Sequence, residues 1–442
     1  MKRWIAFLLT ALLLLLPLSA CKEQPLLDPE APVTLTLWHV FGEQADAPMN
    51  RLVEEFNATV GQEQGILIKV TNVTNTSSIR EQLLEALSDK PDAPEVPDLC
   101  TLHANVAVDI GLDHLLDWNS CFDEETLSGY VPEFLADGTI DGKLAVFPLS
   151  KSTYALFVNG TRFSQFSADT GVTLADLASW EGFFAAAEAY HEWSGGSPFC
   201  AFDYLIRHVE FDRMSKAGDF SYTESGWYDT ADPVLRASWL QFALPLVKGQ
   251  ISVADLYAST HVAAGEALSG IGSTAGIAYY GDTVTYPDNT SEPMNLTVLP
   301  LPKTGEGEQF MPMSGVGLCA TRSTEQKAAA AAIFTRWLTE GARNLDFVVE
   351  TGYMPVSNGA FEAIADYPFE DAVTASLFEA IGTMSAQYTP IVRPTIGGYY
   401  EKTDLLYEWL RQNQAALWER AAAGESAEAL AEETWDFFCS IA

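Results

Sequence analysis

Residues 33–70 have the sequence VTLTLWHVFGEQADAPMNRLVEEFNATVGQEQGILIKV and decide the fold class. Residues 33–37 alternate between apolar and polar side chains, which predicts a strand, and residues 66–70 predict a second strand. Between them, apolar residues recur at helical spacing, at Met49, Leu52, Val53, Phe56 and Val60. A second helix is expected at residues 79–87. This alternation of strands and helices predicts an α/β fold with a mainly parallel sheet.

The rest of the chain also alternates between expected strands and helices, and the whole chain is too long for one ordinary hydrophobic core. The chain has 442 residues, of which 48% are hydrophobic, so two domains are expected. Residues 170–290 are rich in helical patterns and aromatic residues, and strands are expected at 296–301 and 315–320. Helices are expected at 328–338 and across 405–438, with a break near Gly424.

The N-terminus predicts export. Lys2 and Arg3 precede an apolar run from Trp4 to Leu16, which is shorter than the roughly 20 residues that cross a bilayer. The following Leu18-Ser19-Ala20-Cys21 resembles the bacterial lipobox, whose cysteine is lipidated after cleavage. We therefore expect a signal peptide at 1–20, a lipidated tether at 21–32, and an extracytoplasmic protein held on the outer face of the membrane by the lipid on Cys21.

Charge and cysteine content exclude some functions and leave others open. The formal net charge of −36 opposes binding to nucleic acid or to anionic lipid. Besides Cys21, the cysteines are Cys100, Cys121, Cys200, Cys319 and Cys439, with no C-x-x-C motif. Cys100 and Cys121 are close enough in sequence to form a disulfide, but both could equally be buried free thiols.

The sequence contains none of the common enzyme signatures. Neither a P-loop, an H-E-x-x-H motif nor a G-x-S-x-G motif occurs, and the six histidines have no spacing typical of metal ligands. We expect no cofactor, no metal and no catalytic residue. The 60 acidic residues still leave a secreted glycoside hydrolase open, because a catalytic carboxylate pair cannot be recognised among so many.

Aromatic and small polar residues lie next to the expected strand ends, where open α/β sheets bind ligands. Rings can cover the apolar face of a sugar, while hydroxyls can bond its OH groups. These segments are Trp38-His39, Ser152-Thr153-Tyr154, Trp227-Tyr228, Tyr279-Tyr280 and Tyr353.

The order of several motifs resembles the family 1 extracellular solute-binding proteins of ABC importers, the group that contains the maltose-binding protein. These motifs are Leu35-Thr36-Leu37-Trp38-His39, Val96-Pro97-Asp98-Leu99, the stretch 141–159 (DGKLAVFPLSKSTYALFVN), Val298-Leu299-Pro300-Leu301-Pro302, Gly315-Val316-Gly317 and Thr351-Gly352-Tyr353-Met354-Pro355-Val356. The resemblance implies a two-lobe periplasmic-binding-protein-like fold with an interlobe ligand cleft. We expect lobe 1 at 33–150 and 300–340, and lobe 2 at 151–299 and 341–442. It also implies a monomer that captures an extracellular carbohydrate and delivers it to ABC permease subunits.

Within this family, the glycerol-3-phosphate-binding branch is the most similar. Its ligand contacts would correspond to Ser152, Ser273, Gly315 and Tyr353, with Arg393 close to an expected arginine. A tyrosine expected near Asn72–Thr76 and an acidic residue expected after Cys100 are absent. We therefore rank a neutral sugar above glycerol-3-phosphate or another phosphorylated polyol. The predicted ligand-binding residues are Trp38, His39, Ser152, Thr153, Trp227, Ser273, Thr274, Tyr279, Gly315, Tyr353 and Arg393.

Overall fold

The computed structural model describes residues 26–42, 48–76, 78–88, 90–219, 222–255, 257–286, 288–392, 394 and 396–442. The expected signal peptide at 1–20, the lipidation site Cys21, the start of the tether and Arg393 lie outside the described residues. None of the described helices is long and apolar enough to span a bilayer.

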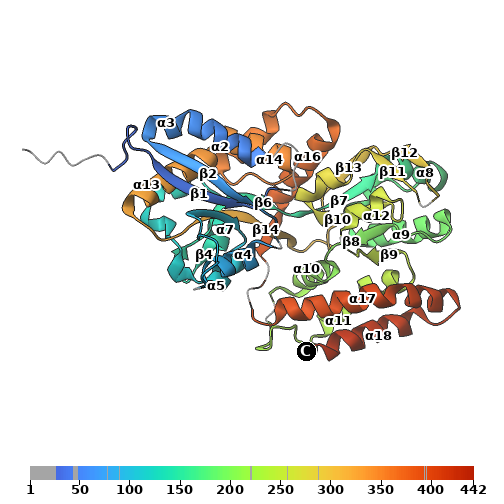
Figure 1. Cartoon of the computed structure of the whole chain (residues 1–442). Coiled ribbons are helices and arrows are strands. Elements are labelled where there is room, and N and C mark those ends of the chain that lie inside the picture. The colour runs from blue at the N-terminus through green and yellow to red at the C-terminus, as the bar shows by residue number, and fades with distance from the viewer. Residues whose placement is uncertain are drawn as a thin grey trace, which may run out of the picture.

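The described residues form two large sheets, each covered by helices, and two separate two-stranded sheets (Figure 1). The predicted strands and helices of the opening stretch are present, and β1 pairs in parallel with β2, so the α/β prediction is confirmed. The first sheet has the order β15-β14-β3-β1-β2, and β6 also pairs with β14. Its strands are β1 (Val33–His39), β2 (Ile66–Val73), β3 (Leu99–Leu102), β6 (Phe147–Ser152), β14 (Gln309–Ala320) and β15 (Tyr388–Val392).

Most helices around the first sheet bury apolar side chains, whereas the short helix Glu124–Leu127 buries none. In α2, Met49, Val53 and Phe56 are buried, as their helical spacing predicts. These helices are α2 (Pro48–Ala58), α3 (Val60–Gln64), α4 (Ile79–Ala86), α5 (Ala104–Ile110), α6 (Glu124–Leu127), α7 (Pro132–Gly138), α13 (Glu325–Leu338), α14 (Gly341–Thr351) and α15 (Asn358–Ala363), and β4 (Thr139–Ile140) pairs with β5 (Lys143–Leu144) beside them.

The second sheet has the order β13-β7-β10-β8-β9. Its strands are β7 (Tyr154–Asn159), β8 (Cys200–Phe202), β9 (Ile251–Val253), β10 (Ser269–Ser273) and β13 (Leu296–Leu299), with a separate hairpin of β11 (Thr283–Thr285) and β12 (Ser291–Pro293). Its helices are α8 (Gly160–Thr170), α9 (Trp180–Ser194), α10 (Leu205–Ala217), α11 (Pro233–Val247), α12 (Ala258–Ala263), α16 (Ala372–Gln387), α17 (Tyr399–Ala422) and α18 (Ala427–Ser440). The predicted break near Gly424 separates α17 from α18, and Gly424 has a φ of 94°.

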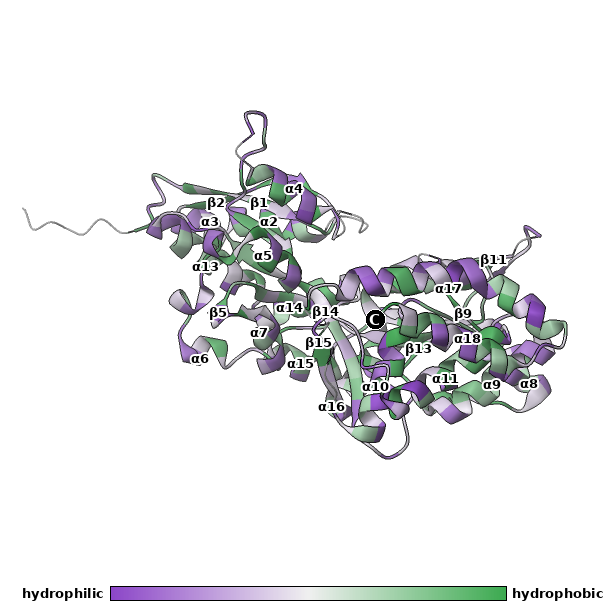
Figure 2. Ribbon diagram, turned by 90° about the horizontal axis from the view of Figure 1, so that it is seen from below, coloured by the Kyte–Doolittle hydropathy of each residue, from purple (hydrophilic) through white to green (hydrophobic). Residues whose placement is uncertain are grey.

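The two sheets belong to two lobes that are joined near β14, which Figures 1 and 2 both place between them. The chain passes from one sheet to the other at Thr153, between β6 and β7, and again at residues 300–308, between β13 and β14. Along β14, successive segments pair with β15, β6 and β3. A single strand therefore connects the core of the first lobe with the junction.

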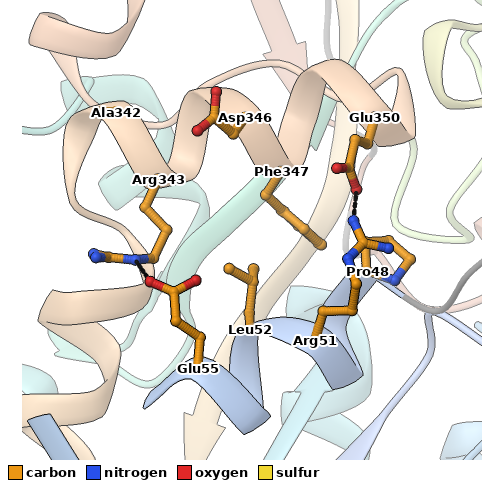
Figure 3. A pocket seen from close by; sticks show the side chains of 9 residues that line it. All are labelled: Pro48, Arg51, Leu52, Glu55, Ala342, Arg343, Asp346, Phe347 and Glu350. Atoms are coloured by element: carbon orange, nitrogen blue, oxygen red, sulfur yellow. Dashed lines mark hydrogen bonds and ion pairs between the residues drawn. The ribbon is translucent and has the colours of Figure 1, made fainter. Parts of the chain in front are cut away.

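The segment 341–442, expected to belong to lobe 2, is divided between the lobes. Helix α14 packs against α2, and α15 packs against α14, so both lie on the first lobe, whereas α16 packs on β13 and β7 of the second sheet. Figure 3 shows why α14 lies on α2: Leu52 and Phe347 point toward each other between the ion pairs Arg51–Glu350 and Arg343–Glu55. Residues of these two helices enclose a cavity of about 370 Å³ that belongs to the first lobe alone.

Candidate functional site

A cavity of about 350 Å³ lies between the lobes and is lined by residues of both sheets. We call it the interlobe cavity. From the first lobe it is lined by Val40, Asn75, Thr76, His103 and Tyr353, and at the junction by Ser152, Ser314 and Gly315. From the second lobe it is lined by Tyr154, Asp203, Tyr204, Tyr257, Ser259, Gly272, Ser273, Ala275, Gly276, Tyr279 and Tyr280.

The strand directions explain why these residues meet. In the first sheet, β1 and β3 are parallel, and Val40 and His103 directly follow them. In the second sheet, β8 and β10 are parallel; Asp203 follows β8 and Ser273 ends β10. Because parallel strands end at the same edge of a sheet, each lobe presents its strand ends to the cavity, as open α/β folds do.

Tyrosine rings form much of the second lobe's side of the cavity. Tyr154 and Tyr204 are stacked with ring centroids 6.4 Å apart, and the buried Tyr280 stacks on Phe157 at 4.4 Å. Tyr279 and Tyr257 are exposed, at 52% and 64% of their surface. From the first lobe, Tyr353 lies edge-on to Phe41 at 6.0 Å. Rings from both lobes thus offer flat apolar surfaces to a bound molecule.

In the neighbouring pairs Ser152-Thr153 and Ser273-Thr274, the serine and the threonine have different positions relative to the cavity. Ser152 and Ser273 line the cavity. The threonine that follows each serine is buried, and the backbone N–H of Thr274 donates to the carbonyl of Thr153 at 2.8 Å. The two threonines therefore fix the positions from which the two serines face the cavity, and do not themselves line it.

Asp203 is the one carboxylate among the described residues that line the interlobe cavity. Its Oδ1 accepts a hydrogen bond of 2.6 Å from the backbone N–H of Ala258, at the start of α12. Its Oδ2 lies so close to Gly272 that a Cβ there would be 2.4 Å away. A side chain at position 272 would therefore displace the Asp203 carboxylate. Burial is the main reason that the pKa of Tyr280 is raised, and the charge of Asp203 adds to it.

At the junction, Gly315 lets β14 approach β6 closely. Its φ is 108°, and a Cβ would lie 2.3 Å from the carbonyl oxygen of Ser150. The carbonyl of Gly315 is 2.7 Å from Nδ1 of His103, which follows β3. This contact connects the strand ends of the first lobe to the strand that leads to the second.

No lysine or arginine is among the described residues that line the interlobe cavity. Lys151 is the neighbour of Ser152 in sequence, but its side chain is buried and forms an ion pair with Asp137. The charge of Lys151 is thus already compensated. Within the described part of the chain, no group of three histidine, cysteine or acidic side chains could hold a metal ion.

Of the predicted ligand-binding residues, the structure brings Ser152, Ser273, Tyr279, Gly315 and Tyr353 together around the interlobe cavity. Thr153 and Thr274 lie directly behind it. Arg393 is outside the described residues.

Three further predicted residues are core residues that do not line the interlobe cavity, which corrects the prediction for them. Trp38 is buried and donates from Nε1 to Thr71 at 3.0 Å. His39 is buried, with Nε2 2.9 Å from the Asn50 side chain, and burial lowers its pKa. Trp227 is buried against Phe438 of α18 and donates to its carbonyl at 3.1 Å.

The sequence prediction missed several lining residues, of which Asp203, Tyr204 and His103 carry the most chemistry. Asp203 and Tyr204 follow a strand of three residues that was not predicted. A search for polar and aromatic residues beyond predicted strands therefore could not identify them. His103 follows β3, the strand that includes Leu99, and the same search would have identified it.

Comparisons with known proteins agree with this architecture. The family model described as bacterial extracellular solute-binding protein matches residues 51–375. Compared with curated protein sequences, the chain has no match.

Solved structures resemble the chain over nearly its whole length. The cyclic alpha-maltosyl-1,6-maltose binding protein of Arthrobacter globiformis is 19% identical over 92% of this chain and 99% of its own, with a TM-score of 0.66. UgpB of Mycobacterium tuberculosis, solved with glycerophosphocholine, is 17% identical over 93% of this chain and 98% of its own, with a TM-score of 0.65. The sugar-binding protein MalE of Xanthomonas citri is 15% identical over 92% and 97%, with a TM-score of 0.64. The predicted two-lobe fold is confirmed.

Proposed function

The chain belongs to the bacterial extracellular solute-binding proteins, and on that premise we propose that it captures an extracellular carbohydrate in the interlobe cavity and delivers it to the permease of an ABC importer. Its ligand is a small solute, and it acts outside the cytoplasm.

The observation that carries the proposal is the composition of the interlobe cavity. Rings of Tyr154, Tyr279 and Tyr353 lie with the hydroxyls of Ser152 and Ser273 around one space of about 350 Å³. A sugar has both an apolar C–H face and many hydroxyl groups, so it needs both kinds of surface. Ligand sites of this kind combine apolar walls with a few placed polar groups.

The charge of the cavity supports a neutral carbohydrate over a phosphorylated polyol. A phosphate would be buried close to Asp203 without a lysine or arginine among the described lining residues, and an uncompensated buried charge is costly. The buried Lys151 is already paired with Asp137. We therefore keep glycerol-3-phosphate as the second candidate.

Binding without turnover is favoured over glycoside hydrolysis by the same geometry. Hydrolases of this kind place two carboxylates beside the scissile bond, roughly 5–9.5 Å apart. Among the described lining residues, Asp203 is the one carboxylate. Closure of the two lobes on the solute, which both lobes contact, would make the loaded form the one that docks on the permease.

A thermal-shift screen tests the proposal. Neutral mono- and oligosaccharides, polyols and their phosphate esters would be added one at a time to the purified protein. A ligand that binds only the folded protein at 100 times its Kd adds about 2.7 kcal/mol to the free energy of unfolding, so a true ligand raises the melting temperature. We expect neutral carbohydrates to do so and to be recovered intact. A chain that responds to none of them, or one that cleaves them, contradicts the proposal.

A further inference from the structure

Two of the buried cysteines lie opposite each other in the first sheet. Strands β3 and β14 are antiparallel, and their register places Cys100 directly across from Cys319. Both residues are fully buried. Because residues that face each other across a ladder point to the same side of the sheet, the two side chains are neighbours.

The phase of the ladder gives the spacing of this pair. One step beyond the paired segment, the backbone N–H of Thr321 donates to the carbonyl of Asp98 at 2.9 Å, so that facing pair is hydrogen-bonded. Hydrogen-bonded and non-bonded pairs alternate along an antiparallel ladder, so the Cys100–Cys319 pair, two steps away, is hydrogen-bonded as well. Such pairs have Cα atoms about 5.5 Å apart, which is inside the range that a disulfide spans.

Both cysteines are free thiols in the structure. Burial raises the pKa of the Cys319 thiol, and the neighbouring Cys100 adds to this rise. A buried thiol with a raised pKa reacts slowly, because the thiolate is the reactive form. Oxidation of this pair therefore belongs to the time before β14 closes over β3, when the newly exported chain is still open.

We propose that Cys100 and Cys319 are joined by a disulfide in the exported protein. The inference rests on the extracytoplasmic location of the family, where disulfides form and persist. The oxidant is a disulfide of the thiol–disulfide exchange class, either a protein or a small molecule. The Cys100 thiolate attacks this disulfide and releases one thiol; the Cys319 thiolate then displaces the second. Two protein thiols and one oxidant disulfide thus become one protein disulfide and two free thiols.

Among the described residues, Cys200 and Cys121 are free thiols, and neither faces another cysteine across a strand pairing. In the second sheet, the facing residues of Cys200 are Ser269 and Ile251. Cys121 is half-buried next to Ser120, in a turn after Trp118. The pairing of Cys100 with Cys121 that the sequence left open is thus replaced by a pairing that only the sheet register reveals.

A peptide map of the wild-type protein tests the disulfide directly. The exported protein is purified without reductant, alkylated in denaturant and digested with trypsin and an Asp-directed protease, which cuts between Cys100 and Cys121 at Asp109, Asp113 or Asp117. We expect the Cys100 peptide to be linked to the peptide that ends at Arg322, with a mass lower by two hydrogens than the sum of the reduced peptides. Alkylated Cys100 and Cys319, or a Cys100–Cys121 link, would overturn the proposal.

Stability provides a second measurement. Protein reduced in denaturant and refolded with reductant should melt at a lower temperature than protein refolded without reduction, because the cross-link limits the unfolded chain. The Cys100→Ala/Cys319→Ala variant should show no difference between the two treatments, whereas the control Cys200→Ala should keep it. Equal melting temperatures in the wild-type protein contradict the disulfide. Neither result bears on solute binding, which the thermal-shift screen tests separately.

Discussion

At the scale of single residues, Asp203 combines charge and fixed geometry in the interlobe cavity. The N–H of Ala258 holds Oδ1, and the absence of a side chain at Gly272 leaves room for Oδ2. A carboxylate held in this way can accept hydrogen bonds from sugar hydroxyls without first having to be ordered. Hydrogen bonds to charged groups contribute about 1.5–3 kcal/mol, more than those between neutral groups.

We predict that Asp203→Asn weakens carbohydrate binding about tenfold or more. The amide keeps the shape of the side chain and an oxygen for the Ala258 N–H, but it lacks the charge, and 1.4 kcal/mol corresponds to a factor of ten. Calorimetric titration measures the change. Glu63→Gln removes the same charge from α3, whose exposed residues are far from the cavity in the fold, and should leave Kd unchanged. Equal affinities for Asp203→Asn and the wild type would remove Asp203 from the site.

His208 makes stability depend on pH. Burial, and then the charge of Arg207, lower its pKa to about 3, and its Nε2 has no hydrogen-bond partner among the described residues. An unfolded chain binds a proton at this histidine below about pH 6.5, whereas the folded chain does not. Protonation of His208 in the unfolded chain therefore leaves the free energy of unfolding unchanged above about pH 6.5 and lowers it as the pH falls from 6.5 toward 3.

We predict that His208→Phe removes this dependence. One such group changes the free energy of unfolding by about 1.4 kcal/mol per pH unit. The wild type should therefore lose about 2 kcal/mol more of its free energy of unfolding between pH 7 and pH 5 than the variant does. Phenylalanine fits the setting, since Tyr154, Trp180 and Phe202 surround this histidine. Urea unfolding at both pH values measures it, with the exposed His114→Gln as control. If the free energy of unfolding decreases equally in His208→Phe and in the wild type between pH 7 and pH 5, the histidine is protonated in the folded protein.

Cys21 lies outside the described residues, and its role remains a prediction from the sequence. If it carries a lipid, Cys21→Ser should yield a protein that partitions into the aqueous phase on detergent extraction, while the wild type partitions into detergent. Binding of the solute should be the same in both. A variant that still follows the detergent phase would reject lipidation at this cysteine.

At the scale of elements, β14 couples the junction to the core. It pairs with β15, β6 and β3 along its length, and Gly315 lies in the part that pairs with β6. We predict that Gly315→Ala destabilises the protein by about 1 kcal/mol or more, because its positive φ and the 2.3 Å approach to the Ser150 carbonyl both exclude a side chain.

The control for this variant is Gly359→Ala. Gly359 lies in α15, where a Cβ would meet nothing within 4 Å, and alanine is favoured over glycine inside a helix. The control should melt at the same or a higher temperature than the wild type, whereas Gly315→Ala should melt lower. A Gly315→Ala variant as stable as the control would show that β14 can shift away from β6.

The elements that the sequence predicted are those with a clear period. The alternation in β1 and the helical spacing in α2 come from one buried and one exposed face, and both elements were located correctly. Strands β8 and β9 were missed because they are three residues long and every residue is buried, which leaves no alternation to detect.

The predicted site followed the same logic. Ser152, Ser273 and Tyr353 were found from their position after expected strands and from the family resemblance, and all three line the interlobe cavity. Trp227 was included because it is aromatic, but an aromatic residue is equally suited to a core, and Trp227 fills one beside α18. Whether an aromatic residue lies in the binding site or in the core depends on packing between segments that are distant in the sequence, and the local sequence pattern does not reveal that packing.

At the scale of the whole molecule, the two lobes and the overall charge act on the solute in different ways. The net charge of −36 repels anions at long range, but salt screens this field beyond about 8 Å, so the groups that line the cavity decide the ligand. Those groups are tyrosine rings, serine hydroxyls and one carboxylate among the described residues. They favour an uncharged, hydroxyl-rich solute held between the lobes.

Calorimetric titration with neutral mono- and oligosaccharides and with glycerol-3-phosphate tests this central claim most directly. We predict saturable binding of at least one neutral saccharide, weakened tenfold or more by Tyr279→Ala, whose ring is exposed in the cavity, and no heat of binding with glycerol-3-phosphate. Tight binding of glycerol-3-phosphate that is lost in Ser152→Ala or Ser273→Ala, with no response to any saccharide, would contradict the account.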